Sequence, residues 1–289
     1  MLKTTSISNL QILLNQYDLY PKKRWGQNFL VDANIVDKIV QAAQINENDF
    51  IVEIGPGLGA LTQALAAKAK GVLSIDIDHS LEKPLREVLK GYDNSKLLFN
   101  DILKVNLEEE LQKAFHLSET PRYKVCANIP YNITTPIIFN LLENCSNLES
   151  ATLMMQKEVA ARILAKPNSK DYGLLTLMIA YYAEARLGLN VSRHCFYPKP
   201  EVDSSVINII PHHNPIVAAE DEAIFKNFIK LAFQKRRKTL LNICSDYFKI
   251  EKSLANSLLQ KININPLHRP ENLNLQDFAM VVNAFMIRG

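Results

Sequence analysis

The chain has 289 residues, of which 47% are hydrophobic and 22% charged, and its net charge is +3. A globular chain of this length buries a large core without help from disulfides or metals and is long enough for two domains. No stretch approaches the roughly 20 apolar residues of a membrane span, and the Ser/Thr-rich segment up to Asn9 lacks the apolar run of a signal peptide, so we expect no membrane partner.

The four cysteines are scattered along the chain. Cys126, Cys145, Cys195 and Cys244 form no CxxC pair, and no group of Cys and His residues has the spacing of zinc ligands. Isolated cysteines of this kind are typical of reduced, mostly buried thiols in a cytosolic protein. We therefore expect a cytoplasmic protein, a monomer, that binds no metal.

The positive charge is concentrated toward the C-terminus. Residues 215–289 contain 11 Lys and Arg against 7 Asp and Glu, a net of +4, whereas the rest of the chain has 22 against 23, a net of −1. A basic excess at one end is expected where that end meets a polyanion. An unevenly solvated surface gives the same count, so charge alone leaves the partner open.

The first predicted elements surround a basic loop. Leucines recur at helical spacing within the first 20 residues, which indicates a short helix or arm. The basic loop follows at residues 21–29. Asp32 is then placed to cap a helix over residues 33–43.

Short apolar strands then alternate with helices. The predicted strands cover residues 50–54, 71–75, 96–99, 123–127 and 151–155. Alternation of this kind, with nearly continuous apolar strands, indicates an α/β fold in which helices cover both faces of a parallel sheet. Two later segments, at residues 183–189 and 204–210, are candidates for edge strands or a hairpin.

The segment at residues 211–215, Pro-His-His-Asn-Pro, has the composition of a linker. After it, apolar residues recur at helical spacing toward the end of the chain. We therefore predict two domains, an α/β domain at residues 1–210 and an α-helical domain at residues 211–289.

A glycine-rich turn follows the first predicted strand, where Gly55, Gly57 and Gly59 stand at alternate positions. Glycines let the backbone turn sharply and approach a ligand closely, and the N-terminus of the following helix adds partial positive charge. The GxGxG spacing differs from the GxGxxG of dinucleotide folds and disfavours an NAD-dependent oxidoreductase. A tight turn suffices for S-adenosylmethionine, which carries no phosphate, but such turns also serve packing alone.

Acidic residues end the next two predicted strands. Asp76 closes the second strand about 20 residues after the first glycine, where a carboxylate is placed to accept hydrogen bonds from both ribose hydroxyls of a nucleoside. Asp78 is a rival for this role. Asp101 follows the third strand and is placed to meet the adenine amino group of a cofactor, because the carboxyl ends of parallel strands face one crevice. A helix cap is the alternative role for Asp101.

The string Asn128-Ile129-Pro130-Tyr131 follows the fourth strand at the same edge. An adenine N6 amine is a poor nucleophile because its lone pair is delocalised into the ring. The amide oxygen of Asn128 and a nearby backbone carbonyl can accept its two hydrogens and aim the lone pair at a sulfonium methyl group. Pro130 fixes the turn and has no N–H, while Tyr131 can stack on the target base. The string therefore favours N6 methylation of adenine over a simple turn.

Several short sequence motifs, each present once, follow one another along nearly the whole chain. They are Gly26-Gln27-Asn28-Phe29-Leu30, Glu53-Ile54-Gly55-Pro56-Gly57-Leu58-Gly59, Asn128-Ile129-Pro130-Tyr131, Met155-Gln156-Lys157-Glu158, Pro167-Asn168-Ser169-Lys170, Phe196-Tyr197-Pro198-Lys199-Pro200-Glu201-Val202-Asp203-Ser204 and Phe233-Gln234-Lys235-Arg236-Arg237-Lys238-Thr239. Together they resemble the small-subunit ribosomal RNA adenine dimethyltransferases of the KsgA type. Several strings in order are far more specific than any one of them.

The resemblance implies a Rossmann-like methyltransferase sheet followed by a small helical domain. Residues 1–210 would then bind S-adenosylmethionine and catalyse, and residues 211–289 would bind the RNA substrate. It further implies transfer of two methyl groups to each of two adjacent adenosines near the 3′ end of small-subunit (16S) rRNA, in a pre-ribosomal particle during ribosome biogenesis. The target base must leave its stack to reach Asn128.

The resemblance also assigns site residues. The cofactor would be surrounded by Asn28, Leu30, Gly55, Gly57, Asp76, Asp101 and Asn128. Phe196 would flank the target adenine opposite Tyr131. The family more often has Glu at the position of Asp76, so the shorter carboxylate requires the strand or the cofactor to sit slightly closer. The family usually has Leu at the position of Ile129, which conserves volume.

Two basic segments are the predicted RNA contacts. One is Lys22, Lys23 and Arg24, and the other is Lys235, Arg236, Arg237 and Lys238, which we expect to form a helical stripe with Lys226 and Lys230. A solvated helix face is the usual outcome for such a run. The two clusters together favour RNA contact.

Two other functions remain open. An erythromycin-resistance methylase has the same chemistry but acts on large-subunit rRNA, although the Phe-Gln-Lys-Arg-Arg-Lys-Thr string resembles the small-subunit enzymes. A non-catalytic ribosome assembly or transcription factor has the same fold. The intact Asn128 string and glycine turn argue against lost catalysis, but not against a second, binding role.

Overall fold

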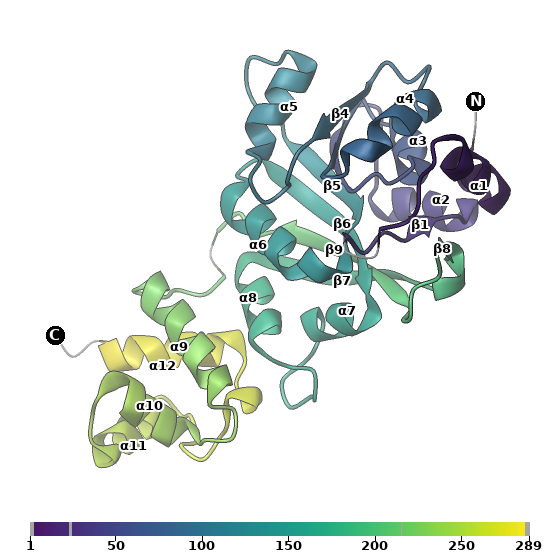
Figure 1. Ribbon diagram of the computed structural model, residues 1–289. Coiled ribbons are helices and arrows are strands. Elements are labelled where there is room, and N and C mark those ends of the chain that lie inside the picture. The colour runs from purple at the N-terminus through teal and green to yellow at the C-terminus, as the bar shows by residue number, and fades with distance from the viewer. Residues whose placement is uncertain (1–2, 23–24, 215, 287–289) are drawn as a thin grey trace. The chain divides into compact units, whose positions relative to one another are not determined.

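The computed structural model describes residues 3–22, 25–214 and 216–286, and it divides into two compact units (Figure 1). Unit 1 comprises Met1–Ala160 and Arg186–Pro211, and unit 2 comprises Ala161–Ala185 and His212–Gly289. The prediction placed residues 161–185 in the first domain. The structure places them in unit 2 because their buried side chains, among them Tyr172, Leu177 and Tyr181, belong to the hydrophobic core of the C-terminal helices.

Unit 1 is built on a seven-stranded sheet with the strand order β4-β3-β2-β5-β6-β9-β7. The strands are β2 (Phe50–Ile54), β3 (Gly71–Asp76), β4 (Ser95–Phe99), β5 (Tyr123–Asn128), β6 (Leu148–Gln156), β7 (Ala183–Val191) and β9 (Ser204–Pro211). The strands from β4 to β6 pair in parallel, as predicted, and β9 pairs antiparallel with β6. The sheet is therefore mixed, with β7 at its edge and β9 inside it rather than at the edge.

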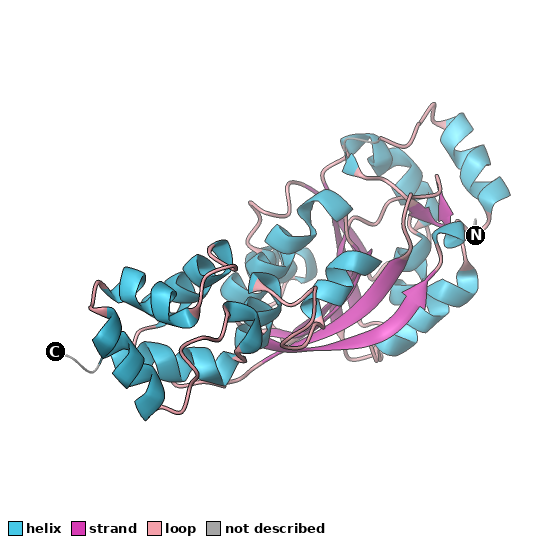
Figure 2. Cartoon of the chain, turned by 90° about the horizontal axis from the view of Figure 1, so that it is seen from below, coloured by secondary structure: helices cyan, strands magenta, loops and turns pink. Residues whose placement is uncertain are grey.

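Helices cover both faces of the sheet (Figure 2). On one face, α2 (Ala33–Ala42) and α3 (Ala60–Ala66) share a buried cluster with Val72 of β3. The neighbouring Gly71 faces α5 (Leu107–Phe115), since a Cβ built there would come within 2.6 Å of a Phe115 ring carbon. Successive strand residues point to opposite faces, so α5 lies on the other side. This unit also contains α4 (Glu82–Val88), α6 (Thr134–Asn144) and most of α7 (Lys157–Ile163).

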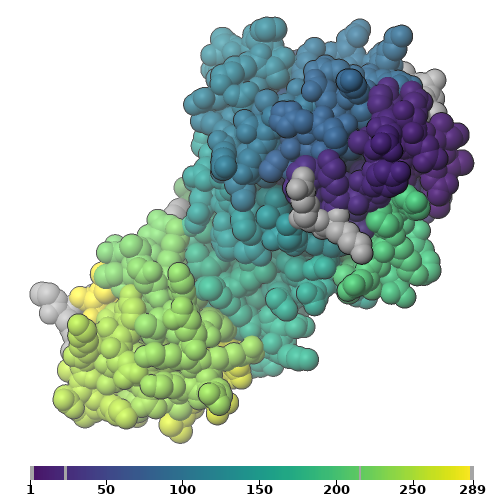
Figure 3. Space-filling view, viewed as in Figure 1, coloured from purple at the N-terminus to yellow at the C-terminus, as the bar shows by residue number. Residues whose placement is uncertain are grey.

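The N-terminal helix and the cap of α2 form as predicted. Helix α1 (Ile7–Gln16) buries its leucines against α4, and Figure 3 shows this N-terminal segment in purple beside the blue segment that contains α4. Asp32 accepts hydrogen bonds from the backbone amides of Asn34 and Ile35, at 2.9 and 3.2 Å. Between the two helices, β1 (Phe29–Leu30) pairs antiparallel with β8 (Phe196–Tyr197).

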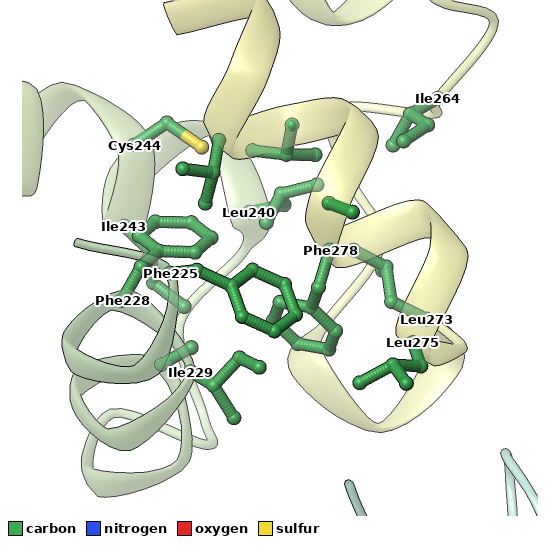
Figure 4. Packing of buried hydrophobic residues seen from close by; sticks show 14 of the residues in the cluster. Phe225, Phe228, Ile229, Leu240, Ile243, Cys244, Ile264, Leu273, Leu275 and Phe278 are labelled. Atoms are coloured by element: carbon green, nitrogen blue, oxygen red, sulfur yellow. The ribbon is translucent and has the colours of Figure 1, made fainter. Parts of the chain in front are cut away.

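Unit 2 is helical. It contains α8 (Leu174–Tyr182), α9 (Glu222–Gln234), α10 (Leu240–Phe248), α11 (Lys252–Lys261) and α12 (Leu275–Met286). Apolar side chains from the last four of these helices converge on one core, in which Phe228, Ile243 and Phe278 are fully buried (Figure 4). The basic residues 235–238 were expected to continue a helix. That expectation is wrong, because α9 ends at Gln234 and residues 235–238 form the turn before α10.

In the described part of the chain, no helix is both long and apolar enough to cross a bilayer. In the same residues, no three His, Cys, Asp or Glu side chains come together in an arrangement able to hold a metal ion.

Candidate active site

The candidate site lies at the point of the sheet where the chain order of the strands reverses. Strand β2 has β3 on one side and β5 on the other, so the carboxyl ends of these strands border the point at which an open α/β sheet binds ligands. A pocket opens there. Its lining includes the glycine turn after β2, Asp76 at the end of β3, residues 128–131 at the end of β5, and residues 25–30.

The glycine turn presents backbone to this pocket. Gly57 has a φ of +58°, and a Cβ built on it would lie 2.9 Å from a ring carbon of Phe29. Gly55 has a φ of +71° and donates its amide to the carbonyl of Ile75 at 2.9 Å. Side chains at these positions would strain the backbone, and at Gly57 would also meet Phe29. The turn is therefore a tight cradle.

Asp76 is joined to that cradle. Its carboxylate accepts a hydrogen bond from the amide of Asp78 at 2.8 Å and further bonds from the amides of Gly57 and Ile77. Burial raises the pKa of Asp76 to about 6, and the charge of Asp78 adds to the effect. Asp76 lines the pocket, where its remaining lone pairs can accept from a ligand.

Asp78, the rival for the ribose role, is engaged elsewhere. Its oxygens accept from Lys22 Nζ at 2.7 Å, Gln27 Nε2 at 2.9 Å and Ser80 Oγ at 2.6 Å. Burial opposes ionisation, but these hydrogen bonds hold the pKa of Asp78 below its usual range. Asp78 is not on the pocket lining. It fixes the loop that carries Gln27, and Asp76 is the better candidate for the ligand.

The orientation of Asn128 fits its predicted role. Its Nδ2 donates to the backbone carbonyl of Asn28 at 3.1 Å. Within the described residues its Oδ1 has no hydrogen-bond partner and remains an acceptor at the pocket, which Asn28, Pro130 and Tyr131 also line. The hydroxyl of Tyr131 is bonded to Ser204 Oγ at 2.6 Å, which fixes the position of its ring.

Glu53 is a pocket residue to which the sequence assigned no role. It lies in β2, is 1% exposed, and accepts hydrogen bonds from Thr62 Oγ1 at 2.6 Å and Ser74 Oγ at 2.8 Å. Burial raises its pKa to about 7. An acidic residue inside an otherwise apolar strand was the signal that could have identified it.

Two predicted site residues do not reach the pocket lining. Asp101 accepts from the amide of Leu103 at 3.1 Å, and its other oxygen lies 3.7 Å from Lys104 Nζ, so it stabilises its own turn. Phe196 is 3% exposed and packs in the core that contains Leu30. Their predicted contacts with the cofactor and the target adenine remain predictions.

Most of the described residues that were predicted to contact RNA have partners within the chain. Lys22 is paired with Asp78, and Lys23 and Arg24 lie outside the described residues. In the turn after α9, Lys235 and Lys238 share Asp246 at 3.1 and 3.2 Å, and Arg236 Nε lies 2.6 Å from Glu271. Arg237 is exposed and has no hydrogen bond or ion pair with any described residue.

The doubly wound sheet, the glycine turn and the polar ends of β3 and β5 define a Rossmann-like methyltransferase. A dimethyladenosine transferase from Plasmodium falciparum has the same fold, with a TM-score of 0.74, 28% identity, and coverage of 90% of this chain and 98% of that one. The 23S rRNA methyltransferase ErmE has a TM-score of 0.70 at 24% identity, and the match covers 90% of this chain and 100% of that one.

Sequence comparison gives the family. The family model for ribosomal RNA adenine dimethylase matches residues 20–286, and the chain belongs to this family. The ribosomal RNA small subunit methyltransferase A of Moorella thermoacetica is 45% identical, over 93% of this chain and 94% of the relative. The protein of the same name from Bacillus cytotoxicus is 42% identical, over 95% of this chain and 94% of the relative.

Proposed function

We propose that this chain dimethylates the N6 atoms of two adjacent adenosines near the 3′ end of small-subunit (16S) rRNA during ribosome biogenesis, with S-adenosylmethionine as methyl donor. The observation that carries the proposal is the free acceptor of Asn128 at the edge of the pocket, with its amide nitrogen held by Asn28. The names of the two bacterial relatives support the small subunit as substrate.

The composition of the pocket fits S-adenosylmethionine. Two carboxylates line it, the buried Glu53 and the partly buried Asp76, and no Lys or Arg is among the described residues that do. A phosphate-bearing cofactor needs cations or a longer cradle of amides. Carboxylates suit a ligand that carries a sulfonium and an ammonium group, and the glycine cradle accommodates its amino-acid and ribose parts.

The residues of the chain then have distinct tasks. Asp76 accepts the ribose hydroxyls, and the Gly55–Gly57 turn leaves room for the amino-acid part. When bound, the cofactor supplies an electrophilic methyl group. Asn128 Oδ1 accepts a hydrogen of the adenine N6 amine, which directs the lone pair out of the ring plane. Tyr131, held by Ser204, stacks on the extruded base.

Unit 1 is the proposed cofactor-binding and catalytic part, and unit 2 the proposed RNA-binding part. We further propose that the protein acts in the cytoplasm as a monomer. Phosphate contacts would come from the N-terminal basic loop and from Arg237, which has no competing carboxylate among the described residues.

The direct test compares two substrates. Small and large ribosomal subunits are taken from cells that lack N6-methylated adenosines in their rRNA, and each is incubated with labelled S-adenosylmethionine. Label in small subunits alone is the expected result. Label in large subunits alone would establish the erythromycin-resistance type of activity, and RNA binding without label in either would establish a non-catalytic assembly factor.

A further inference from the structure

The N-terminal arm contributes a side chain to the pocket that none of the roles above uses. Thr4 lines the pocket together with Leu10 of α1. Thr4 is 0% exposed, and its hydroxyl oxygen is buried without a hydrogen-bond partner among the described residues. Of the residues that carry such an oxygen, Thr4 is the one on the lining of this pocket.

The arm is anchored, so the position of Thr4 is defined. Asn9 donates its side-chain amide to the carbonyl of Lys3 at 2.9 Å, on the residue before Thr4. Two residues after Thr4, the carbonyl of Ser6 accepts from the amide of Leu10 at 2.9 Å. Leu10 is itself buried against α4, in a cluster that also contains Leu85 and Val88. Residues 3–10 are therefore held against the body of unit 1.

A buried hydroxyl without a partner is costly, and proteins satisfy nearly all such groups. A valine of the same shape would avoid this cost, so an unpaired hydroxyl on a residue that lines a pocket points to a ligand that completes it. Resting on the proposed function, we infer that Thr4 is a cofactor-binding residue whose hydroxyl forms a hydrogen bond with a polar group of S-adenosylmethionine. The arm then forms one wall of the cofactor site, outside the residues 20–286 that the family model matches.

The test measures cofactor binding and stability in the same variants. Thr4→Val keeps the shape and removes the hydroxyl, while Thr4→Ser keeps the hydroxyl. Thr5→Val is the matched control, because Thr5 is partly exposed and is not on this pocket lining. Calorimetric titration with S-adenosylmethionine should show about tenfold weaker binding for Thr4→Val, the size of one hydrogen bond to a ligand. Thr4→Ser should stay within about threefold of the unmodified protein, and Thr5→Val should bind equally well.

Thermal unfolding without ligand separates this role from a structural one. Thr4→Val should unfold at the same temperature as the unmodified protein or a higher one, because the variant no longer buries an unpaired hydroxyl. Amide hydrogen exchange should slow over residues 3–16 when the cofactor is added, and less so in Thr4→Val.

Three results would overturn the inference. One is equal cofactor affinity of Thr4→Val and the unmodified protein. The second is a lower unfolding temperature of ligand-free Thr4→Val, which would mean that the hydroxyl has a partner within the chain. The third is an equal loss of affinity in Thr5→Val, which would indicate a general disturbance of the arm. If the unmodified protein does not bind S-adenosylmethionine, the proposed function itself fails, and the inference fails with it.

Discussion

Asn128 is the residue on which the proposed chemistry depends, because the proposed mechanism uses its oxygen as the side-chain acceptor for the amine to be methylated. We predict that Asn128→Ala slows single-turnover methyl transfer by at least about a hundredfold, the usual cost of losing one preorganised polar contact to a reacting group. Cofactor affinity measured by calorimetry should fall only slightly. Near-normal turnover in this variant would contradict the mechanism.

Asp76 should control cofactor affinity. Loss of its hydrogen bonds to the ribose in Asp76→Ala should weaken S-adenosylmethionine binding by roughly 2–4 kcal/mol, because two charge-assisted bonds are removed. Asp78→Ala is the comparison, since Asp78 holds Lys22 and Gln27 rather than the pocket. Binding that is unchanged in the first variant and lost in the second would reverse the assignment of the two carboxylates.

The raised pKa of Asp76 gives a pH dependence with a definite sign. The ionised form accepts the ribose hydroxyls, so the affinity for S-adenosylmethionine should fall as the pH drops through about 6, by up to tenfold per unit. Asp76→Asn should bind weakly at all pH values and lose this dependence. The ratio of the two affinities at each pH cancels any ionisation of the ligand. A parallel dependence in both proteins would place the titrating group elsewhere, with Glu53, whose pKa is raised to about 7, as the next candidate.

The stability of the ligand-free protein should respond to pH in the opposite direction. A carboxyl group whose pKa is higher in the folded state binds more protons there than in the unfolded chain. The contribution of Asp76 to the free energy of unfolding should therefore decrease as the pH rises from about 4 to about 6. Thermal unfolding of the unmodified protein and Asp76→Asn over this range checks the sign.

At the residue level, the sequence located the site but could not rank its carboxylates. Asp76 and Asp78 both stand near the end of one strand, and the contacts that separate them come from Lys22 and Gln27, which lie 56 and 51 positions away from Asp78. Asn128 could be chosen because an amide oxygen at the end of β5 is suited to accept a hydrogen of an adenine N6 amine. For Asp101, the structure shows contacts within its own turn rather than the helix cap that the sequence left as an alternative, since α5 begins at Leu107 with Asn106 as its cap.

The turn between α9 and α10 is the element whose role most needs an experiment. Arg237 is exposed and has no partner among the described residues, whereas Arg236 is paired with Glu271. We predict that Arg237→Gln reduces the slope of log affinity against log salt for the rRNA substrate by about 0.7–0.9, without loss of thermal stability. Filter binding across a salt series measures the slope.

Arg236→Gln is the matched variant. It removes a partly exposed ion pair within unit 2, so the free energy of unfolding should fall by no more than about 1 kcal/mol. If Arg237→Gln leaves both the salt slope and the methylation rate unchanged, this turn is an ordinary solvated segment. The RNA contact would then have to come from other basic residues.

Elements with a simple apolar period were predictable, and those defined by tertiary packing were not. The strands and the capped helix α2 follow from local patterns. The end of α9 also had a signal, since its apolar stripe stops at Ala232 and residues 235–238 offer no side chain for the core. No sequence signal indicated that residues 161–185 belong to unit 2, because the core that contains Leu177 is formed by helices far along the chain.

At the scale of the whole molecule, the proposed function requires a cofactor pocket in unit 1 and an rRNA substrate. The fold was predictable from the alternation of strands and helices, and the family from strings spread along the chain. The part of the pocket lining that the arm contributes was not predictable, because nothing in the sequence around Thr4 indicates that this residue is buried and lines the same pocket as the glycine turn. The chemical identity of the methylated product therefore tests the proposed function of the whole molecule.

The most direct measurement is nucleoside analysis after complete reaction. Small subunits without the modification are incubated with excess S-adenosylmethionine and either the unmodified protein or Asn128→Ala, and their rRNA is digested and examined by mass spectrometry. The account predicts two N6,N6-dimethyladenosines per particle with the unmodified protein and almost none with Asn128→Ala. Monomethyladenosine as the sole product at completion, or equal dimethylation by both proteins, would contradict it.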